Sequence, residues 1–480
     1  MEENNKIYWK GIEQLTNDPE FVKYAEKEFP EYLKIKDAYG DNTEDNETST
    51  SRRDFLKLMG FSVAAVSLAA CEASVKHAIP YLNKPETVDP SIPNYYASTY
   101  IENGEALPVV VKTREGRPIF VEGNVLSKFT KGGTNARVSA SVLGLYDIEK
   151  AKNPSVKDGS GRKEVSWETI DAEIINKLKG ASQIRIVANT IVSPSTKKVI
   201  AEFATKYGAD KVKLVQYDSI SRYAIVEAHK RTKGKAVLPS YDFSKAKTVV
   251  SIGADFLASW VSDVEHTKQF SQTRKIGKIG NDSKEMSRLF VFESIMSLTG
   301  SSADYRTPIK PSQTANVVAK LFNLVAAKTG KTVLNVESAE VKYLSKAADE
   351  LVANAGKSLV VSGSNDPNIQ VLVNGINEML GNYGQTIDTE VAYSYQRQGN
   401  DADMANFIQE VANGSVNSVI FYNCNPVYDH PLGSTLATAL PKVSLTVATG
   451  DRIDETSTLC QYHTPDTHYL ESWGDAEIKR

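Results

Sequence analysis

The chain has 480 residues and a formal net charge of −3, from 56 basic and 59 acidic side chains. This length fits about three domains with sizeable cores. The near balance of charge excludes the basic field that nucleic-acid-binding proteins carry. Only three cysteines are present, Cys71, Cys424 and Cys460. They are too few for a disulfide framework, or for a four-cysteine iron–sulfur cluster held by this chain alone.

Residues 1–50 form an N-terminal extension that is polar and acidic. Its aromatic residues are spaced as in short amphipathic helices, and a run rich in Asp, Asn, Glu and Thr follows them. Such a composition cannot bury enough apolar surface to fold independently. We therefore expect a helical or disordered extension that stays on the cytoplasmic side of the membrane during export.

Residues 51–71 are typical of an export signal joined to a lipidation site. An uncharged run from Leu58 ends in Leu-Ala-Ala-Cys at Cys71, and it is too short to cross a hydrocarbon core of ~30 Å comfortably as a helix. The signal residues before this run are Arg52, Arg53, Phe55, Leu56 and Lys57. This order predicts export by the twin-arginine (Tat) translocase and acylation of Cys71, with the protein anchored at the periplasmic face of the inner membrane. The alternative is a small-residue helix that follows two arginines by chance.

The exported body begins with a proline-rich linker at residues 72–94, which fits an extended spacer. Residues 95–155 are expected to be β-rich. Two alternating apolar runs, 107–112 and 118–122, flank Glu115 and Gly116, and this pattern predicts a β-hairpin.

From residue 156 onwards the pattern changes to apolar strands that alternate with helices, which predicts an α/β fold with two doubly wound, mainly parallel sheets. We assign residues 156–312 to a first α/β domain and residues 313–480 to a second. Strands are expected in the first domain at 184–188, 211–215, 248–253 and 288–293. Strands of the second are expected at 358–363, 418–423 and 445–448. The accompanying helices are expected near 193–207, 223–231, 314–327 and 368–380.

Three strand ends could receive a phosphate of a nucleotide or a pterin, because open parallel sheets bind ligands where their strands end. The residues concerned are Gly253, Asp255, Gly363, Asn425 and Pro426. Each of these segments could equally be a plain strand-to-helix turn. No Gly-x-Gly-x-x-Gly fingerprint stands at a first strand and no P-loop motif is present, so ordinary dinucleotide and NTP sites are disfavoured. A zinc site at His463 and His468 lacks a compact fourth ligand.

Several segments in order resemble the molybdopterin oxidoreductase superfamily, from about Tyr95 to the last residue. They begin with the segment 112–124 and the run Gly132-Gly133-Thr134-Asn135-Ala136-Arg137. The later ones are Trp260 with Arg274, Glu293 with Asp304, Asn425-Pro426-Val427-Tyr428, and Trp473-Gly474-Asp475. The resemblance implies the fold of that superfamily, with its cofactor loops at the strand ends.

Three departures from the superfamily pattern bear on chemistry. Residues 94–101 contain no cysteine where redox-active members place a cluster motif, and no serine or cysteine stands out as a molybdenum ligand. A cofactor-closing domain would follow Asp475 in the family, so we expect the chain to correspond to the first part of such a protein. With the displaced signal and the lipobox, these features resemble the B subunit of alternative complex III.

That resemblance implies a scaffold subunit of a quinol-oxidising respiratory complex, which contacts other subunits and the membrane. It implies that molybdopterin is not bound here and that iron–sulfur clusters belong to a downstream half absent from this chain. Two other hypotheses remain. One is an active molybdopterin-dependent oxidoreductase whose cluster lies on another subunit. The other is a soluble substrate-binding module on an α/β scaffold, which leaves the folded-export signal unexplained.

Overall fold

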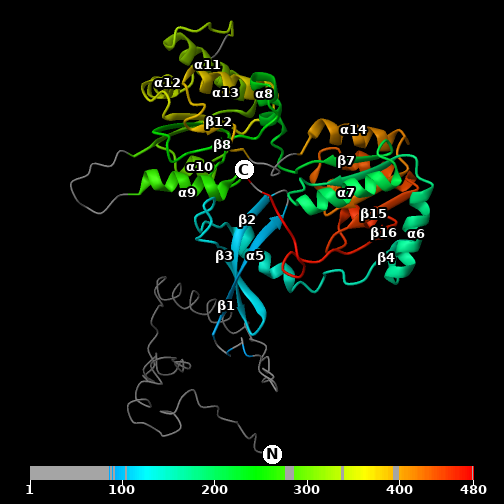
Figure 1. The fold of residues 1–480 in the computed structure, drawn as a ribbon. Coiled ribbons are helices and arrows are strands. Elements are labelled where there is room, and N and C mark those ends of the chain that lie inside the picture. The colour runs from blue at the N-terminus through cyan, green and yellow to red at the C-terminus, as the bar shows by residue number, and fades with distance from the viewer. Residues whose placement is uncertain are drawn as a thin grey trace, which may run out of the picture. The chain divides into compact units, whose positions relative to one another are not determined.

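The computed structural model describes residues 86, 89, 92–102, 105–275, 286–336, 340–392, 399–477 and 479 (Figure 1). The chain separates into two units, Met1–Leu82 and Asn83–Arg480, and every described residue belongs to the second. The expected N-terminal extension, the twin-arginine segment, Cys71 and most of the proline-rich linker therefore lie outside the described residues. None of the helices within the described ranges is long and apolar enough to cross a membrane.

An antiparallel three-stranded sheet opens the described part of the chain. Its strands are β1 (Asn94–Glu102), β2 (Glu105–Arg114) and β3 (Arg117–Gly123), in that spatial order. The predicted hairpin is confirmed, with Glu115 at φ 50° and Gly116 at φ 77°, the two positive values that a tight two-residue turn requires. Helix α5 (Ala136–Leu145) covers one face, where Val138 and Val142 pack on Val109, Val111 and Val121.

A seven-stranded sheet forms the core of a first lobe. Its spatial order is β5 (Gly161–Glu164), β4 (Ser155–Asp158), β16 (Tyr462–His463), β15 (Leu445–Thr449), β14 (Ser418–Tyr422), β6 (Ile184–Ala188) and β7 (Val212–Gln216). The strands from β16 to β7 are parallel, and β4 and β5 form an antiparallel edge. Its main helices are α6 (Trp167–Lys179), α7 (Pro194–Tyr207), α14 (Asp401–Ala412) and α16 (Gly433–Ala439). Alternate strand residues contribute to two separate cores, as expected for a sheet covered on both faces.

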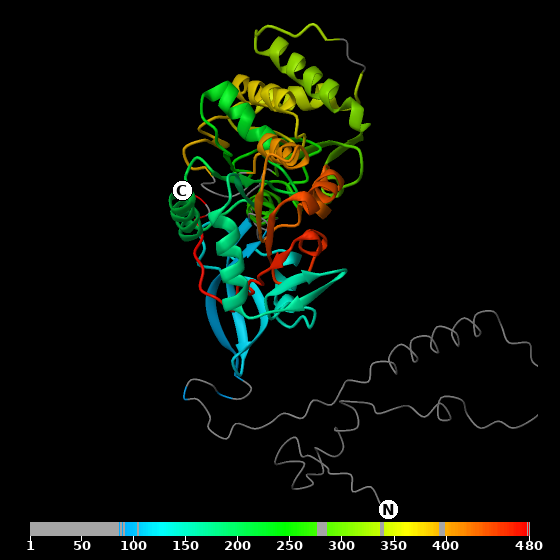
Figure 2. The ribbon, with the colours of Figure 1, turned by 90° about the vertical axis from the view of Figure 1, so that its right-hand side faces the viewer.

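A four-stranded, wholly parallel sheet forms the core of a second lobe. Its order is β11 (Tyr305–Pro308), β10 (Arg288–Glu293), β9 (Thr248–Ile252) and β12 (Ser358–Ser362). Helices α11 (Thr314–Lys328), α12 (Leu344–Ala353) and α13 (Pro367–Met379) share the apolar core on one face. Residues of α8 (Tyr223–Lys233) and α9 (Asp263–Arg274) share the core on the other. Figures 1 and 2 show these helices around the sheet, in green and yellow.

The partition of the strands differs from the one expected from sequence. Strands β6 and β7 pair with β14 and β15, whereas β9 and β10 pair with β12. The boundary at 312/313 is therefore wrong as a division between sheets. The four-stranded lobe is instead an insertion between β7 and α14, and we call it the inserted lobe; the seven-stranded lobe is the discontinuous lobe. Buried parallel strands have the same apolar composition in both sheets, so local pattern cannot reveal which strands pair.

Candidate functional site

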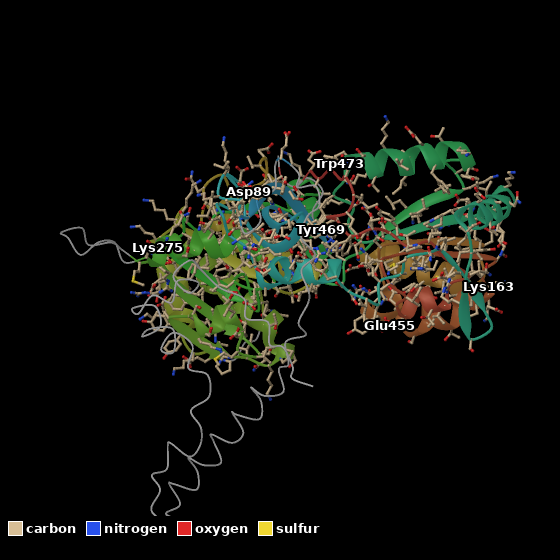
Figure 3. All side chains as sticks on the ribbon, turned by 90° about the horizontal axis from the view of Figure 1, so that it is seen from below. Asp89, Lys163, Lys275, Glu455, Tyr469 and Trp473 are labelled. Atoms are coloured by element: carbon tan, nitrogen blue, oxygen red, sulfur yellow. The ribbon has the colours of Figure 1, made fainter. Side chains whose placement is uncertain are left out.

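A cleft of about 1510 Å³ opens at the carboxyl ends of three adjacent parallel strands, β6, β14 and β15. Ligands of open α/β sheets bind at this kind of position. Residues of β1, of α5 and of the segment 466–475 complete the walls. In that segment Tyr469 packs edge-on against Tyr100, with ring centroids 5.6 Å apart, and its hydroxyl lies 2.8 Å from that of Ser141. Trp473 is fully exposed (Figure 3).

The loop after β14 forms part of the cleft and is held by its own side chains. The Asn425 side-chain oxygen accepts hydrogen bonds from the backbone nitrogen (3.1 Å) and hydroxyl (2.7 Å) of Thr456. Its amide donates to Glu455 at 2.6 Å. Asn425 thereby ties β14 to α17 (Glu455–Leu459), and Pro426 is the buried first residue of the short helix α15 (Pro426–Asp429). Both residues are thus part of the loop's own architecture.

A protonatable group lies beneath this loop. The Tyr217 hydroxyl donates to Asp429 Oδ1 at 2.8 Å, and the Cys424 thiol donates to the Val187 carbonyl at 3.3 Å. Burial raises the pKa of Asp429 to about 6, and it also raises the pKa of the Tyr217 phenol and of the Cys424 thiol. At neutral pH Cys424 is therefore a thiol rather than the thiolate that binds metals.

The charges around the cleft are predominantly negative. Six aspartates line it: Asp147, Asp429, Asp451, Asp454, Asp466 and Asp475. The lining cations are Arg137 and Arg452, and each is already paired within the protein. Arg137 lies 2.9 Å from Glu105 and 3.4 Å from Asp263. Arg452 lies 3.2 Å from Asp147 and 3.1 Å from Asp451.

The N-terminus of α7 faces the cleft, and a carboxylate of the chain itself already occupies it. Ser193 caps the helix by accepting from the Thr196 nitrogen at 3.0 Å. Asp475 accepts hydrogen bonds from the Ser193 hydroxyl, from the Ser195 nitrogen (3.1 Å) and from the Ser195 hydroxyl (2.8 Å). These bonds lower the pKa of Asp475. A helix N-terminus is where a phosphate would otherwise bind.

Comparisons with known proteins agree with this architecture, although no family model matches the chain. The chain is 25% identical over 414 residues to the menaquinone reductase, molybdopterin-binding-like subunit, of Nitratidesulfovibrio vulgaris strain Hildenborough, covering 76% of this chain and 57% of that protein. Acetylene hydratase from Pelobacter acetylenicus superposes with a TM-score of 0.54 at 11% identity, over 78% of this chain and 61% of that one. The chain has the fold of the molybdopterin oxidoreductase superfamily. It spans less than two thirds of the length of either protein.

The charges of the cleft disfavour a phosphate-bearing ligand. A pterin carried on a dinucleotide brings phosphate groups, which need unpaired cations and open helix N-termini. Here the two lining arginines are paired, Asp475 caps α7, and the remaining carboxylates would repel an anion.

The matching strand ends in the inserted lobe are closed. Gly253 has φ +66°, and a Cβ on Gly363 would lie 2.0 Å from the Gly253 carbonyl oxygen, so the two loops pack backbone to backbone. Asp255 Oδ1 accepts from the nitrogen (2.9 Å) and hydroxyl (2.7 Å) of Thr299. The Trp260 indole donates to the Ser362 carbonyl at 3.1 Å. Of the five strand-end residues selected from sequence as phosphate-site candidates, only Asn425 lines the cleft.

Within the described ranges no group of three or more His, Cys, Asp or Glu side chains is arranged to hold a metal ion. His468 donates to the Ser141 carbonyl at 3.0 Å, and burial lowers its pKa. His463 lies on β16, is fully buried and does not line the cleft. The two histidines therefore do not form the zinc site considered from sequence.

Sequence reasoning missed Asp429, Tyr217 and the capping role of Asp475. Asp475 follows Trp473 and Gly474 in a motif that carried the family resemblance, so its position was a usable signal. No local pattern indicates that it reaches a helix about 280 residues earlier in the chain, as its bond to Ser195 requires. Asp429 and Tyr217 likewise meet only through the pairing of distant strands.

Proposed function

We propose that this chain is a non-catalytic, molybdopterin-oxidoreductase-like scaffold subunit of a quinol-oxidising respiratory complex of the alternative complex III type. The observation that carries the proposal is the cleft, where paired arginines and six aspartates, one of them the Asp475 cap, stand at the strand ends where ligands of open α/β sheets bind. The relative from Nitratidesulfovibrio vulgaris supports it, since that protein is named as a molybdopterin-binding-like subunit of a menaquinone reductase.

The role that follows is to position other subunits rather than to transfer electrons. Iron–sulfur clusters would be held elsewhere in the complex, because Cys424 and Cys460 are the two cysteines after the lipobox. Burial raises the pKa of Cys460 to about 12, so neither thiol is prepared to ligate iron at neutral pH. We place the subunit at the periplasmic face of the inner membrane, exported through the Tat pathway by Arg52 and Arg53 and held there by acylated Cys71.

Metal and pterin analysis of the membrane-extracted complex tests the scaffold role. The subunit is isolated from the complex under conditions that keep it folded, and molybdenum is measured by elemental analysis. Pterin is measured by fluorescence after acid release and oxidation. We expect both to be far below one equivalent per chain. Stoichiometric molybdenum or pterin would establish the competing hypothesis, an active molybdopterin-dependent oxidoreductase.

Mass spectrometry of the same material tests the location. We expect no peptide from residues 1–70 and a lipid-bearing N-terminal peptide that begins at Cys71. One acyl chain binds membranes only marginally, so more than one chain or a partner subunit must complete the anchor. An intact peptide that spans Ala70 and Cys71 as the dominant species contradicts the lipoprotein assignment.

A further inference from the structure

The three-stranded sheet exposes aromatic and apolar side chains at one end. This end carries the β2–β3 turn and the start of β1, since Asn94 pairs with Thr113. Figures 1 and 2 show it directed away from the two lobes. Tyr95 is 53% exposed, Phe120 44% and Ile119 45%. Closer to the lobes, the same sheet buries its apolar residues beneath α5.

Register and an irregularity in β3 explain why these side chains gather there. Tyr95, Lys112 and Phe120 are direct cross-strand neighbours, with Lys112 in the middle, so their side chains lie on one face. The Lys112 nitrogen lies 5.9 Å from the centre of the Tyr95 ring. Between Lys112 and Thr113 the register shifts by one residue, which leaves Ile119 opposite no partner. This bulge turns Ile119 outward beside Phe120, so two consecutive apolar residues face solvent.

Basic side chains surround this apolar row. Lys112 is half-buried, and Arg114 and Arg117 are exposed on either side of the turn. Glu115 is the acidic residue of the turn, so the charge here is positive, whereas the whole chain is negative. We call the six residues Tyr95, Lys112, Arg114, Arg117, Ile119 and Phe120 the distal surface.

We propose that the distal surface binds the anionic headgroup region of the membrane and fixes the orientation of the subunit on it. Tyr and Phe beside Lys and Arg are suited to the boundary between hydrocarbon and headgroups, where rings enter the apolar side and cations meet phosphates. Lysine is depleted at protein–protein interfaces, whereas Lys112 stands between Tyr95 and Phe120 here, which disfavours a partner subunit as the occupant. The inference rests on the proposed location at the membrane, and it adds a second contact beside the lipid on Cys71.

Vesicle flotation of the full-length chain with Cys71→Ser, which cannot be acylated, measures this contact. Arg114→Gln with Arg117→Gln should weaken binding to phosphatidylglycerol vesicles about twenty-fivefold, because each basic residue near an anionic surface contributes roughly fivefold. Binding to neutral phosphatidylcholine vesicles should be unchanged by this pair. The matched control is Lys157→Gln with Lys163→Gln, in the β4–β5 hairpin, where no loss is expected. Equal loss in both pairs, or no loss in either, overturns the proposal.

Every variant still contains the apolar run of residues 58–70, which could itself bind vesicles. Tryptophan fluorescence quenching by brominated lipid reports contact at one position and so separates the distal surface from this run. Phe120→Trp should be quenched by brominated phosphatidylglycerol vesicles, whereas Ile295→Trp, at an exposed apolar position of the inserted lobe, should not. Absence of quenching at position 120, or equal quenching at both positions, overturns the proposal. It is also overturned if a variant of the distal surface loses a partner subunit while its vesicle binding stays intact. The chain in these experiments is not acylated and its pterin content is not measured. Their result therefore does not decide the scaffold hypothesis, which the metal and pterin analysis tests separately.

Discussion

The carboxyl ends of the two parallel sheets are built from similar strand-to-loop segments, yet one is closed and the other is open. In the inserted lobe, Gly253 and Gly363 pack backbone to backbone and Asp255 binds Thr299. In the discontinuous lobe, the ends of β6, β14 and β15 border a cleft of about 1510 Å³. Polar or glycine-containing strand ends therefore do not by themselves indicate a ligand site. Whether a ligand can bind depends on which groups of the protein fill the space beyond the strand ends.

The largest expected effect tests the closed end. Gly363→Ala places a Cβ 2.0 Å from the Gly253 carbonyl oxygen, a contact that only backbone movement relieves. We expect the free energy of unfolding to fall by about 3 kcal/mol, measured by urea denaturation. Gly474→Ala is the matched control at the cleft, because no atom lies within 4 Å of its added Cβ. That change should stay within about 0.5 kcal/mol, and equal effects at both positions would remove the distinction between the two ends.

An intermediate effect compares equivalent side chains at the two ends. Asp255→Ala leaves the buried Thr299 nitrogen and hydroxyl without their acceptor, and we expect a loss of about 2 kcal/mol. Asn425→Ala removes the same pair of bonds from Thr456, but water from the cleft can replace the lost oxygen, so about 1 kcal/mol is expected. Thermal and urea unfolding of both variants measure the difference. A larger loss for Asn425→Ala would show that its loop is the more tightly sealed.

The smallest effect depends on pH and concerns Asp429. Its pKa in the folded chain is raised to about 6, above the ordinary value of 3.8, because burial disfavours the carboxylate. The contribution of this raised pKa to the free energy of unfolding is therefore fully present below about pH 4 and is lost as the pH rises through 6. Asp429→Asn, which still offers an oxygen to Tyr217, should remove this slope and raise stability at pH 7 by about 1 kcal/mol, a figure reduced for partial solvent screening.

Denaturant titrations from pH 4 to 8 follow this prediction, with Asp451→Asn as a control at a half-buried position of the cleft rim. If the two variants show the same pH profile as the unaltered chain, Asp429 is ionised as freely as a surface carboxylate. The loop after β14 would then be open to water throughout, which would sharpen the contrast with the closed end of the inserted lobe.

Local pattern alone predicted the α/β class, the β2–β3 hairpin, strands β6, β7, β9, β10, β12, β14 and β15, and helices α7, α8, α11 and α13, because periodicity, turn residues and helix caps act over a few neighbours. The Glu115-Gly116 turn and the Ser193 cap of α7 are of this kind. Twin arginines and a lipobox are also local signals. These residues lie outside the described part of the chain, so the export that they predict stays a prediction.

Tertiary structure alone decided which strands share a sheet and which strand ends stay open. Strand β6 pairs with β14, more than 230 residues away, and equally apolar strands offered no local reason to prefer this partner. Asp475 reaches the N-terminus of α7, and Gly363 meets Gly253, only after these pairings have formed. The electrostatic character of the cleft arises from side chains brought together from distant segments. The spacing of these residues along the sequence does not show which of them are neighbours in space.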